Sequence, residues 1–510
     1  MPTRTVSNAG GNYNSVGTWV EGAVPTSADD VVFTATSGNL TVNVASACLS
    51  INFTNYVGTI TFTNSITVSG NINLGTGGYT QAGAGGLIVN ATGTLTGGGV
   101  TWSRTLTFSG TSQTFTLSGN WTQTGQLNLS ATTTCVINGN TINLAGNLVT
   151  TTTARTTGTA TIVLNGTSTW SNSSTGWLGL NLTINTTGTI TFASGNLYYG
   201  AVNTSTPVLT FTSGTIVRTG NTLNIQQCAI NGNNYTINNM NLAGFGSYTY
   251  TINSNINVVN LGITGTNINT LSGAGSINVS GNLSRTANVD FRGATGTITF
   301  TGSGTWSDSF PTSNFIPEIV FNTAGTITIS GTVGKNSGTI THISGSVSGG
   351  TISVGGTSIT FNTSGVTFNN ITFTAGFVNN VTLNSTLNAT TIAVTGTNSV
   401  NFTGTAGFNC GTLSIVNGGT VTLRNGITYD VNTSIVRRTG ATVNISSDSA
   451  TLTANLHYNR YNVNTNIGNF SLTRINARGG FRILTAQGMV HTDCMNVSKG
   501  EGDITQILMN

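Results

Sequence analysis

Apolar and polar residues alternate along most of the chain. In the segments TITFTNSITVSGNINL (59–74), TLTFSGTSQTFTLSG (105–119) and TITFTGSGTW (297–306), Ile, Leu, Phe and Val alternate with Thr, Ser and Asn. A period of two gives strands with one apolar face and one polar face. Gly and Asn interrupt these runs at short intervals, as turns between strands require. The pattern therefore predicts many short β-strands and no long helix.

The strand pattern also repeats as a unit. A strand, a Gly-containing turn and a second strand recur in INFTNYVGTITF (51–62), LTINTTGTITF (182–192), IVFNTAGTITI (319–329) and LSIVNGGTVTL (413–423). Longer copies pair residues 161–195 with 297–331, and residues 214–225 with 434–445. Repeated strand-turn units are typical of solenoids, in which each coil contacts mainly its neighbours. Within the repeated G-T-I-T strand we expect Ile190 and Ile327 to point inward.

These repeats predict an all-β fold: an elongated right-handed parallel β-solenoid (β-helix) with short end caps and a small C-terminal module. Like residues of a solenoid stack about 4.8 Å apart, so stacked charges would repel each other, whereas Asn and Thr can form hydrogen-bonded ladders. With about 20 to 25 residues per coil, roughly 400 residues make about 16 to 20 coils and a rod of about 80 to 100 Å. A tandem array of β-sandwich domains is the alternative.

The composition agrees with stacking and excludes several classes of protein. Only 5% of the 510 residues are charged, against about 25% in an average soluble domain. Frequent β-branched residues and only five prolines favour a folded β-protein over a disordered chain. No run approaches the roughly 18 apolar residues of a membrane helix. Four dispersed arginines are the only charged residues between positions 31 and 289, which argues against nucleic-acid binding.

Both ends of the chain differ from the repetitive body. We expect residues 1–45 to form an N-terminal cap or attachment segment, because an aromatic, acidic and proline-containing stretch precedes the first regular strand. Residues 46–454 form the predicted β-solenoid shaft. Residues 455–510 regain charge and hold three of the five methionines. This shift indicates a separate C-terminal module that serves oligomerisation, capping or the tip.

The opening of the chain and its repeats resemble phage tail-fibre proteins and related bacterial surface adhesins. The resemblance rests on the spaced residues Trp19, Gly22, Pro25, Asp29 and Asp30, followed by Thr/Asn/Gly-rich copies of the G-T-I-T-F strand. It covers most of the chain. It implies an elongated, often trimeric protein that binds cell-surface glycans or proteins.

The first residues bear on localisation. They contain one early Arg but no apolar stretch that could serve as the core of a secretory signal. A virion protein released by lysis needs no such signal, so the start favours a virion location over an extracellular or cell-surface one. A secreted adhesin whose signal had been removed would look the same.

Carboxylates are the first residues to test for catalysis. Glycoside hydrolysis usually needs two carboxyl groups about 5 to 9.5 Å apart, and Asp290, Asp308 and Glu318 are the acidic residues in the middle of the chain. Coil stacking could bring two of them together. The structural interpretation is that Asp308 starts a turn and Glu318 lies at the edge of a loop. We predict no catalytic residue and no enzymatic activity.

Metal and phosphate sites have little support in the sequence. His342, His457 and His491 are isolated, without an HxH or HExxH arrangement, and His342 is expected to be a packed or surface residue. The glycines of residues 75–86 lack the following helix and the Lys of a phosphate loop, so this segment is expected to be a flexible turn. We predict no metal and no cofactor.

The five cysteines, unlike zinc or redox cysteines, are far apart. No pair has CxxC spacing, so we expect mostly buried and inert thiols at these positions: Cys48, Cys135, Cys228, Cys410 and Cys494.

Aromatic residues could stack on sugar rings. Trp102, Trp170 and Trp306 all occur in T-W-S after a Gly-rich turn, and Trp177 follows closely. Their repetition favours a packing role over ligand contact. Tyr458, Arg460 and Tyr461 could contact a receptor or form a module interface, and no receptor-contact residue is assigned.

Three functional hypotheses follow. The first is a non-enzymatic structural and adhesive fibre component of a phage virion, which contacts host surface structures. The second is a secreted bacterial surface adhesin of the same fold, and the third is a β-solenoid polysaccharide depolymerase. The expected partners are like chains, with a homotrimer favoured, other virion proteins, and a glycan or protein of the host surface. Neither nucleic acid nor membrane insertion is expected.

Overall fold

The chain folds as a parallel β-solenoid of about 17 turns, as its repeats predict, and the alternative of tandem sandwich domains is wrong. The computed structural model describes residues 1–131, 133–151, 155–172, 176–193, 196–200, 206–218, 222–243, 246–265, 269–288, 290–292, 295–374, 378–395, 399–415, 420–424, 427–437, 442–445, 451–454, 482–485 and 488–491. Among these residues the only helix is the short 3-10 helix η1 (Val16–Thr18). Strands therefore make up nearly all of the regular structure.

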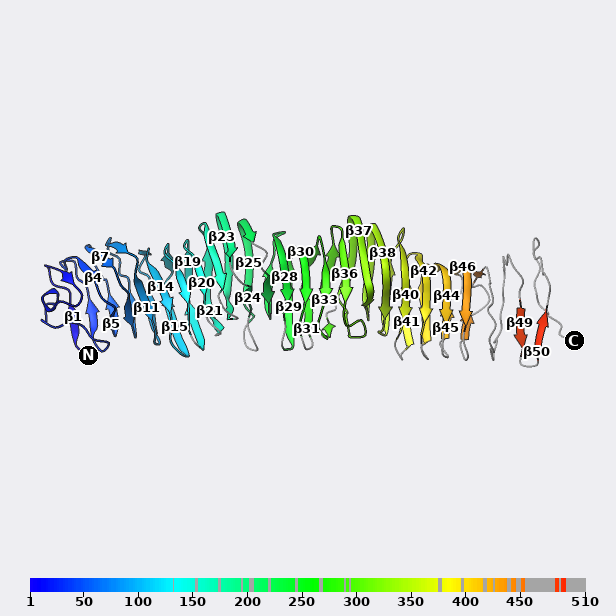
Figure 1. Cartoon of the computed structure of the whole chain (residues 1–510), viewed down its shortest axis with the longest axis horizontal. Helices are drawn as coiled ribbons and strands as arrows, with labels where there is room; N and C mark the ends of the chain where they lie inside the picture. Colours follow the sequence, from blue (N-terminus) through cyan, green and yellow to red (C-terminus); the bar gives the residue numbers. More distant parts are fainter. Residues whose placement is uncertain are drawn as a thin grey trace. The chain divides into compact units, whose positions relative to one another are not determined.

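The chain divides into two compact units: unit 1 (Met1–Ala243 and Tyr248–Ile256) and unit 2 (Gly244–Ser247 and Asn257–Asn510). In unit 1, parallel strands stack on three sides, and the chain visits the sides in turn (Figure 1).

The strands of unit 1 fall into three stacks. The first contains β1 (Thr3–Thr5), β3 (Asp30–Val32), β6 (Ser50–Asn52), β9 (Ile72–Asn73), β12 (Gly93–Thr96), β15 (Gln113–Ser118), β18 (Thr134–Gly139), the starts of β21 (Arg155–Leu164) and β23 (Trp177–Ala193), β24 (Leu197–Tyr199), β26 (Leu223–Ile225) and β28 (Thr236–Leu242). The second contains β2 (Gly11–Asn12), β4 (Leu40–Val42), β7 (Thr59–Phe62) and β10 (Thr80–Gly83) as one sheet, then β13 (Thr101–Trp102), β16 (Trp121–Gln123), β19 (Thr141–Leu144), later parts of β21 and β23, β25 (Val208–Arg218), β27 (Cys228–Asn231) and β29 (Tyr248–Ser254). The third contains β5 (Ser46–Cys48), β8 (Ile66–Val68), β11 (Gly86–Val89), β14 (Thr105–Phe108), β17 (Leu127–Leu129), β20 (Leu148–Thr150), β22 (Ser168–Asn172) and the ends of β23 and β25.

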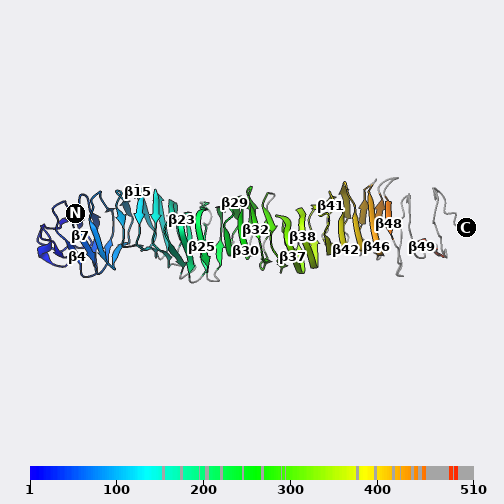
Figure 2. The same cartoon turned by 90° about the horizontal axis from the view of Figure 1, so that it is seen from above.

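Unit 2 continues the same kind of parallel stacking, which Figure 2 shows from a second side. Its parallel strands are β30 (Ile256–Ile263), β31 (Asn269–Ser272), β32 (Ser276–Val279), β33 (Leu283–Arg285), β34 (Phe291–Arg292), β35 (Thr297–Phe300), β36 (Gly304–Asp308), β37 (Glu318–Gly334), β38 (Gly338–Val354), β39 (Ser358–Asn362), β40 (Thr367–Phe373), β41 (Val378–Leu383), β42 (Leu387–Val394), β43 (Ser399–Gly404), β44 (Phe408–Ile415), β45 (Thr420–Leu423), β46 (Thr428–Arg437), β47 (Thr442–Ile445) and β48 (Thr451–Ala454). Two further strands, β49 (Arg482–Thr485) and β50 (Gly488–His491), pair antiparallel.

Inward positions recur from coil to coil, in the third stack of unit 1 at a spacing of 21 residues. Leu106 of β14 lies beside Leu127 of β17, and Leu127 lies beside Leu148 of β20, so the position recurs every 21 residues. All three side chains are fully buried. The predicted inward positions Ile190 and Ile327 are also fully buried, which confirms their assignment. The coil length lies within the range expected from the sequence.

Outward polar residues form the predicted ladders between successive coils. The Nδ2 of Asn253 donates to Oδ1 of Asn231 in unit 1, and the Nδ2 of Asn384 donates to Oδ1 of Asn362 in unit 2, each at 2.9 Å. The hydroxyls of Thr382 and Thr403 share a hydrogen bond of 3.1 Å. Uncharged side chains that can both donate and accept thus satisfy each other in a parallel stack, where like charges would repel.

One glycine illustrates why the corners need this residue. Gly83, at the end of β10, has a φ of +87°, which L side chains rarely adopt. A Cβ atom built there would also lie 2.1 Å from the carbonyl oxygen of Phe62 in the preceding coil. A larger residue would therefore force successive coils apart at this corner.

The segment 75–86 is not the flexible turn that its glycines suggested. It contains β10, which pairs with β7 in register from Thr80 beside Thr59 to Gly83 beside Phe62. The side chain of Tyr79 is buried and stacks on the ring of Phe53, with ring centroids 5.0 Å apart. The register with β7 and the buried ring of Tyr79 order this segment despite its glycine content.

Residues 1–45 supply β1 to β4, and residues 18–21 lie against the outer edge of β1. Trp19 is buried, and its Nε1 donates to the carbonyl oxygen of Tyr13 at 2.9 Å. The predicted C-terminal module, residues 455–510, lies outside the described residues except for β49 and β50.

Candidate functional site

Charged residues gather in one part of unit 2. Six of them lie between positions 285 and 335, in a chain with only 15 basic and 11 acidic residues. We call these six residues the charged cluster: Arg285, Asp290, Arg292, Asp308, Glu318 and Lys335. They surround the nine-residue connection between β36 and β37, residues 309–317, which we call the β36–β37 loop.

The centre of the cluster is a buried ion pair between Arg285 on β33 and Asp308 on β36. The two residues are direct neighbours in the parallel register. The Nε of Arg285 donates to Oδ1 of Asp308 at 2.8 Å, and its Nη2 donates to Oδ2 at 2.5 Å. Both side chains are only 2% exposed. This bidentate geometry is the strong arrangement of guanidinium and carboxylate groups.

The carboxylate of Asp308 has further donors. The backbone N–H of Phe310 donates to Oδ1, and the backbone N–H of Gly334 donates to Oδ2, each at 2.9 Å. The bond from Phe310 is the turn-starting contact that the sequence predicted for Asp308. Four donors occupy the two oxygens, so this carboxylate holds the fold together and has no free lone pair directed at a substrate.

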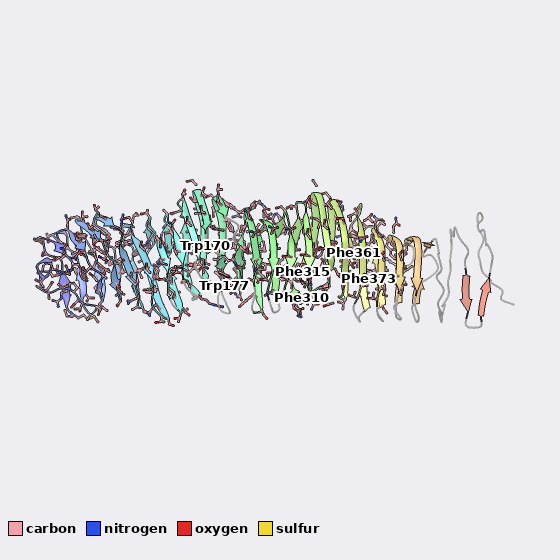
Figure 3. The ribbon with its side chains drawn as sticks, viewed as in Figure 1. Trp170, Trp177, Phe310, Phe315, Phe361 and Phe373 are labelled. Carbon is pink, nitrogen blue, oxygen red and sulfur yellow. The ribbon has the colours of Figure 1, made fainter. Side chains whose placement is uncertain are left out.

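Arg285 also holds the β36–β37 loop. Its Nη1 donates to the carbonyl oxygens of Ser313 and Asn314 at 3.2 Å, and its Nη2 donates to that of Phe310 at 2.5 Å. The guanidinium carbon lies 5.3 Å from the ring centroid of Phe315. Phe310 and Phe315 lie at this loop in Figure 3. One buried cation therefore fixes the path of the loop.

Asp290 ties the same loop from its other side. Its Oδ1 accepts from the backbone N–H of Asn314 at 3.2 Å, and its Oδ2 accepts from Asn314 Nδ2 at 3.1 Å and from Arg292 Nη2 at 2.9 Å. Partial burial alone would raise the pKa of Asp290, but the hydrogen bonds from Arg292 and Asn314 outweigh it and hold that pKa below its usual value. Asp290 and Asp308 thus meet at one loop, each with its own cationic partner.

Glu318 begins β37, at the loop edge that the sequence predicted. The hydroxyl of Thr297 donates to Oε2 of Glu318 at 3.5 Å. Glu318 lies beside Thr297 in the register, whereas Asp308 lies beside Arg285.

Lys335, like Arg292, is a member of the cluster that the sequence analysis did not single out. It is fully buried, and its Nζ donates to the carbonyl oxygens of Ile316, at 3.0 Å, and Ser337. Burial lowers the pKa of Lys335 to about 7, and the negative charge of Glu318 opposes part of that shift. Its neighbour Asn336 accepts from the N–H of Phe315 at 3.0 Å. The return of charge after a long neutral stretch was the signal for this region.

His342 lies in β38, and both of its ring nitrogens are within hydrogen-bonding distance of backbone carbonyl oxygens. Its Nδ1 lies 3.1 Å from the carbonyl oxygen of Ser364, and its Nε2 lies 3.1 Å from that of Gly345. This agrees with the expected packed or surface role. His457 lies outside the described residues, and His491 ends β50, where only the backbone is described. Within the described part of the chain, no three His, Cys, Asp or Glu side chains are grouped to hold a metal ion.

The tryptophans are core residues. Trp102, Trp170 and Trp306 are at most 2% exposed, and Trp177 is 8% exposed, as a packing role predicts. The ring of Trp170 packs edge-on against Phe192, with centroids 5.5 Å apart, and Trp177 packs against Tyr198 (Figure 3). The other aromatic candidates, Tyr458, Arg460 and Tyr461, lie outside the described residues.

Four of the five cysteines are buried: Cys48, Cys135, Cys228 and Cys410. Burial raises the pKa of the Cys135 thiol to about 12 and also holds the pKa of Cys228 well above its usual value. The expectation of buried thiols is therefore confirmed at these four positions, and the raised pKa of Cys135 and Cys228 agrees with low reactivity there. Cys494 lies outside the described residues.

Comparisons with known proteins give no relative. No protein family, no curated protein and no solved structure matches this chain. Over the described residues, no helix is long and apolar enough to cross a membrane.

Proposed function

We propose that this chain is a structural, non-enzymatic fibre component of a phage virion, in which the β-solenoid serves as a shaft and the fibre contacts the host surface. The observation that carries the proposal is the arrangement of the charged side chains in the cluster, which bond to one another and to the backbone. The buried groups of Arg285 and Asp308 are directed at each other and at the β36–β37 loop. The remainder of the described coils consists mainly of apolar inward rows and neutral polar outward rows.

The proposed assembly is a homotrimer whose register is set by residues 455–510, with other virion proteins at one end and a glycan or protein of the host surface as the receptor. Neutral outward rows support this arrangement, because like chains can lie side by side without charge repulsion. Truncation after Ala454 should then give β-rich material without a discrete trimer in analytical ultracentrifugation. A truncated chain that still forms the trimer would contradict the assigned role of these residues.

The decisive test is the location of the protein. Antibodies raised against the full chain should label purified phage particles in electron micrographs, and particles from a phage that lacks the gene should not be labelled. Labelling of bacterial cell surfaces in place of particles would contradict the virion proposal and support the secreted adhesin. New reducing ends or unsaturated sugars after incubation with host polysaccharide would contradict the non-enzymatic role.

A further inference from the structure

The outer edge of β1 in unit 1 is occupied by the chain itself. The carbonyl oxygen of Pro2 accepts from the N–H of Asp30 at 2.9 Å, and the N–H of Val6 donates to the carbonyl oxygen of Val32 at 3.1 Å. Within residues 2–6, the even-numbered residues therefore direct their backbone N–H and C=O groups toward β3. Because neighbouring residues of a strand direct these groups to opposite edges, Thr5 and Ser7 face the outer edge.

Residues 18–21, which we call the strap, take up this outer edge. The N–H of Ser7 donates to the carbonyl oxygen of Thr18 at 2.8 Å, and the N–H of Val20 donates to that of Thr5 at 2.9 Å. The carboxylate of Glu21 accepts from the N–H of Thr5 at 2.8 Å. Val6 and Trp19 form an antiparallel bridge. The strap thus behaves as a short antiparallel strand laid on a parallel stack.

Buried side chains anchor the strap from beneath. The indole of Trp19 is 2% exposed and packs edge-on against Tyr13, with ring centroids 5.1 Å apart. The hydroxyl of Thr18 donates to the carbonyl oxygen of Asn12 at 2.7 Å. In contrast, Val20 is 65% exposed. The edge contacts of Val20 and Glu21 therefore come from residues that do not anchor the strap, and these two contacts can be changed separately from the anchor.

We propose that the strap is an intramolecular competitor for β1, and that the edge it covers pairs antiparallel with β1 of a second copy of this chain when the strap is released. An uncovered strand edge is a template for another strand. The strap demonstrates that this edge takes an antiparallel partner. Two identical β1 edges that pair antiparallel are related by a two-fold axis, which gives a closed, self-complementary contact.

Two substitutions remove both strap contacts to Thr5, keep the bond between Ser7 and Thr18, and leave the anchor in place. Val20→Pro removes the N–H that bonds to Thr5, and Glu21→Ala removes the carboxylate acceptor. Trp19 has an extended backbone, with φ −111° and ψ 134°, which suits a residue before proline. Val20→Thr is the matched control, because it keeps the N–H at an exposed position.

The test compares the full-length V20P/E21A variant with V20T by light scattering coupled to size exclusion, over a range of protein concentrations. We expect V20P/E21A to shift toward twice the mass of the wild-type species as concentration rises, while V20T stays at the wild-type mass. With Thr3→Cys added, a short bifunctional maleimide should cross-link V20P/E21A chains into a doubled species. The same cysteine in the V20T background should give no such product.

Two outcomes would overturn the proposal. One is a V20P/E21A variant that keeps the wild-type mass at all concentrations, with circular dichroism and melting temperature also unchanged. The other is open-ended growth into multimers. Such growth would mean that the β1 edge pairs with the opposite end of another chain and not with another β1. A V20P/E21A variant that unfolds is replaced by Glu21→Ala alone, for which the same two readouts apply with a smaller shift.

Discussion

Two equivalent positions, one in each unit, solve the same packing problem with different chemistry. In unit 1, Thr150 lies beside Asn172 in the register, two residues after the buried Trp170. In unit 2, Arg285 lies beside Asp308, two residues after the buried Trp306. In the neutral pair, Thr150 Oγ1 donates to the carbonyl oxygen of Ser171 in the next coil, and Asn172 Nδ2 donates to that of Gly176, each at 3.2 Å.

The lengths of the following connections explain the difference. Four residues separate β22 from β23 in unit 1, whereas nine separate β36 from β37 in unit 2. The longer loop brings extra backbone carbonyls to the corner, and three of them accept from Arg285. The buried cation of unit 2 therefore supplies donors to the carbonyls of the longer loop. At the shorter connection of unit 1, neutral side chains occupy the same two positions.

The largest expected loss of stability tests the apolar inward rows, which both units share. Ile190→Asp in unit 1 and Ile327→Asp in unit 2 each place an unpaired carboxylate in an apolar row, at a cost of about 4 to 5 kcal/mol. Urea unfolding followed by circular dichroism should show an earlier transition in both variants. Ile190→Val and Ile327→Val, which should cost about 1 kcal/mol, are the controls, and full tolerance of Asp at both sites would contradict the inward assignment.

The next largest loss of stability is expected only in unit 2, where the buried pair is charged. Arg285→Thr leaves Asp308 buried without its cation and should destabilise the fold by about 3 kcal/mol. The double variant R285T/D308N carries the pair found in unit 1, and it should regain part of the loss because the buried charge is gone. Hydrogen exchange should rise at residues 309–317 in both variants, since the loop carbonyls lose their donor. A double variant less stable than R285T would contradict this account of the cluster.

A third effect depends on pH and belongs to unit 2. Lys335 has a pKa of about 7 in the fold and about 10.4 when unfolded, so between these values the unfolded chain binds the extra proton. Stability should therefore rise with pH, by about 2 kcal/mol from pH 7 to pH 9. Urea midpoints measured across this range should show the rise. Lys335→Met should reduce the slope, and an unchanged slope would exclude Lys335 as its source.

The smallest effect compares the outward ladders of the units. Asn253→Ala removes the donor to Asn231 in unit 1, and Asn384→Ala removes the donor to Asn362 in unit 2. Each exposed bond should contribute only about 0.5 kcal/mol. Melting temperatures of the two variants should fall slightly and by similar amounts. A large fall in one unit alone would mean that its ladder contributes more than surface hydrogen bonding.

Much of the fold could be predicted because the same alternation of apolar inward and polar outward residues acts at every coil. Alternation placed Ile190 and Ile327 inward, and repetition gave stacking and coil length. The charged cluster could be predicted only in part, because it lies where a long loop interrupts this alternation. The turn role of Asp308 follows from its own neighbours in sequence, whereas its pairing with Arg285 depends on a register between residues 23 positions apart. The burial of Lys335 depends on how the β36–β37 loop folds over it, which alternation does not encode.

The spacing of 21 residues between Leu106, Leu127 and Leu148 has a consequence for the gene. An in-frame duplication or deletion of one whole coil returns each later side chain to its original row, so the protein keeps its faces. A change of a single residue inside a strand exchanges the inward and outward faces until the next corner absorbs it. Recombination between coding segments of matching coils can therefore lengthen or shorten such a gene in whole-coil steps, and selection will remove most other insertions within strands.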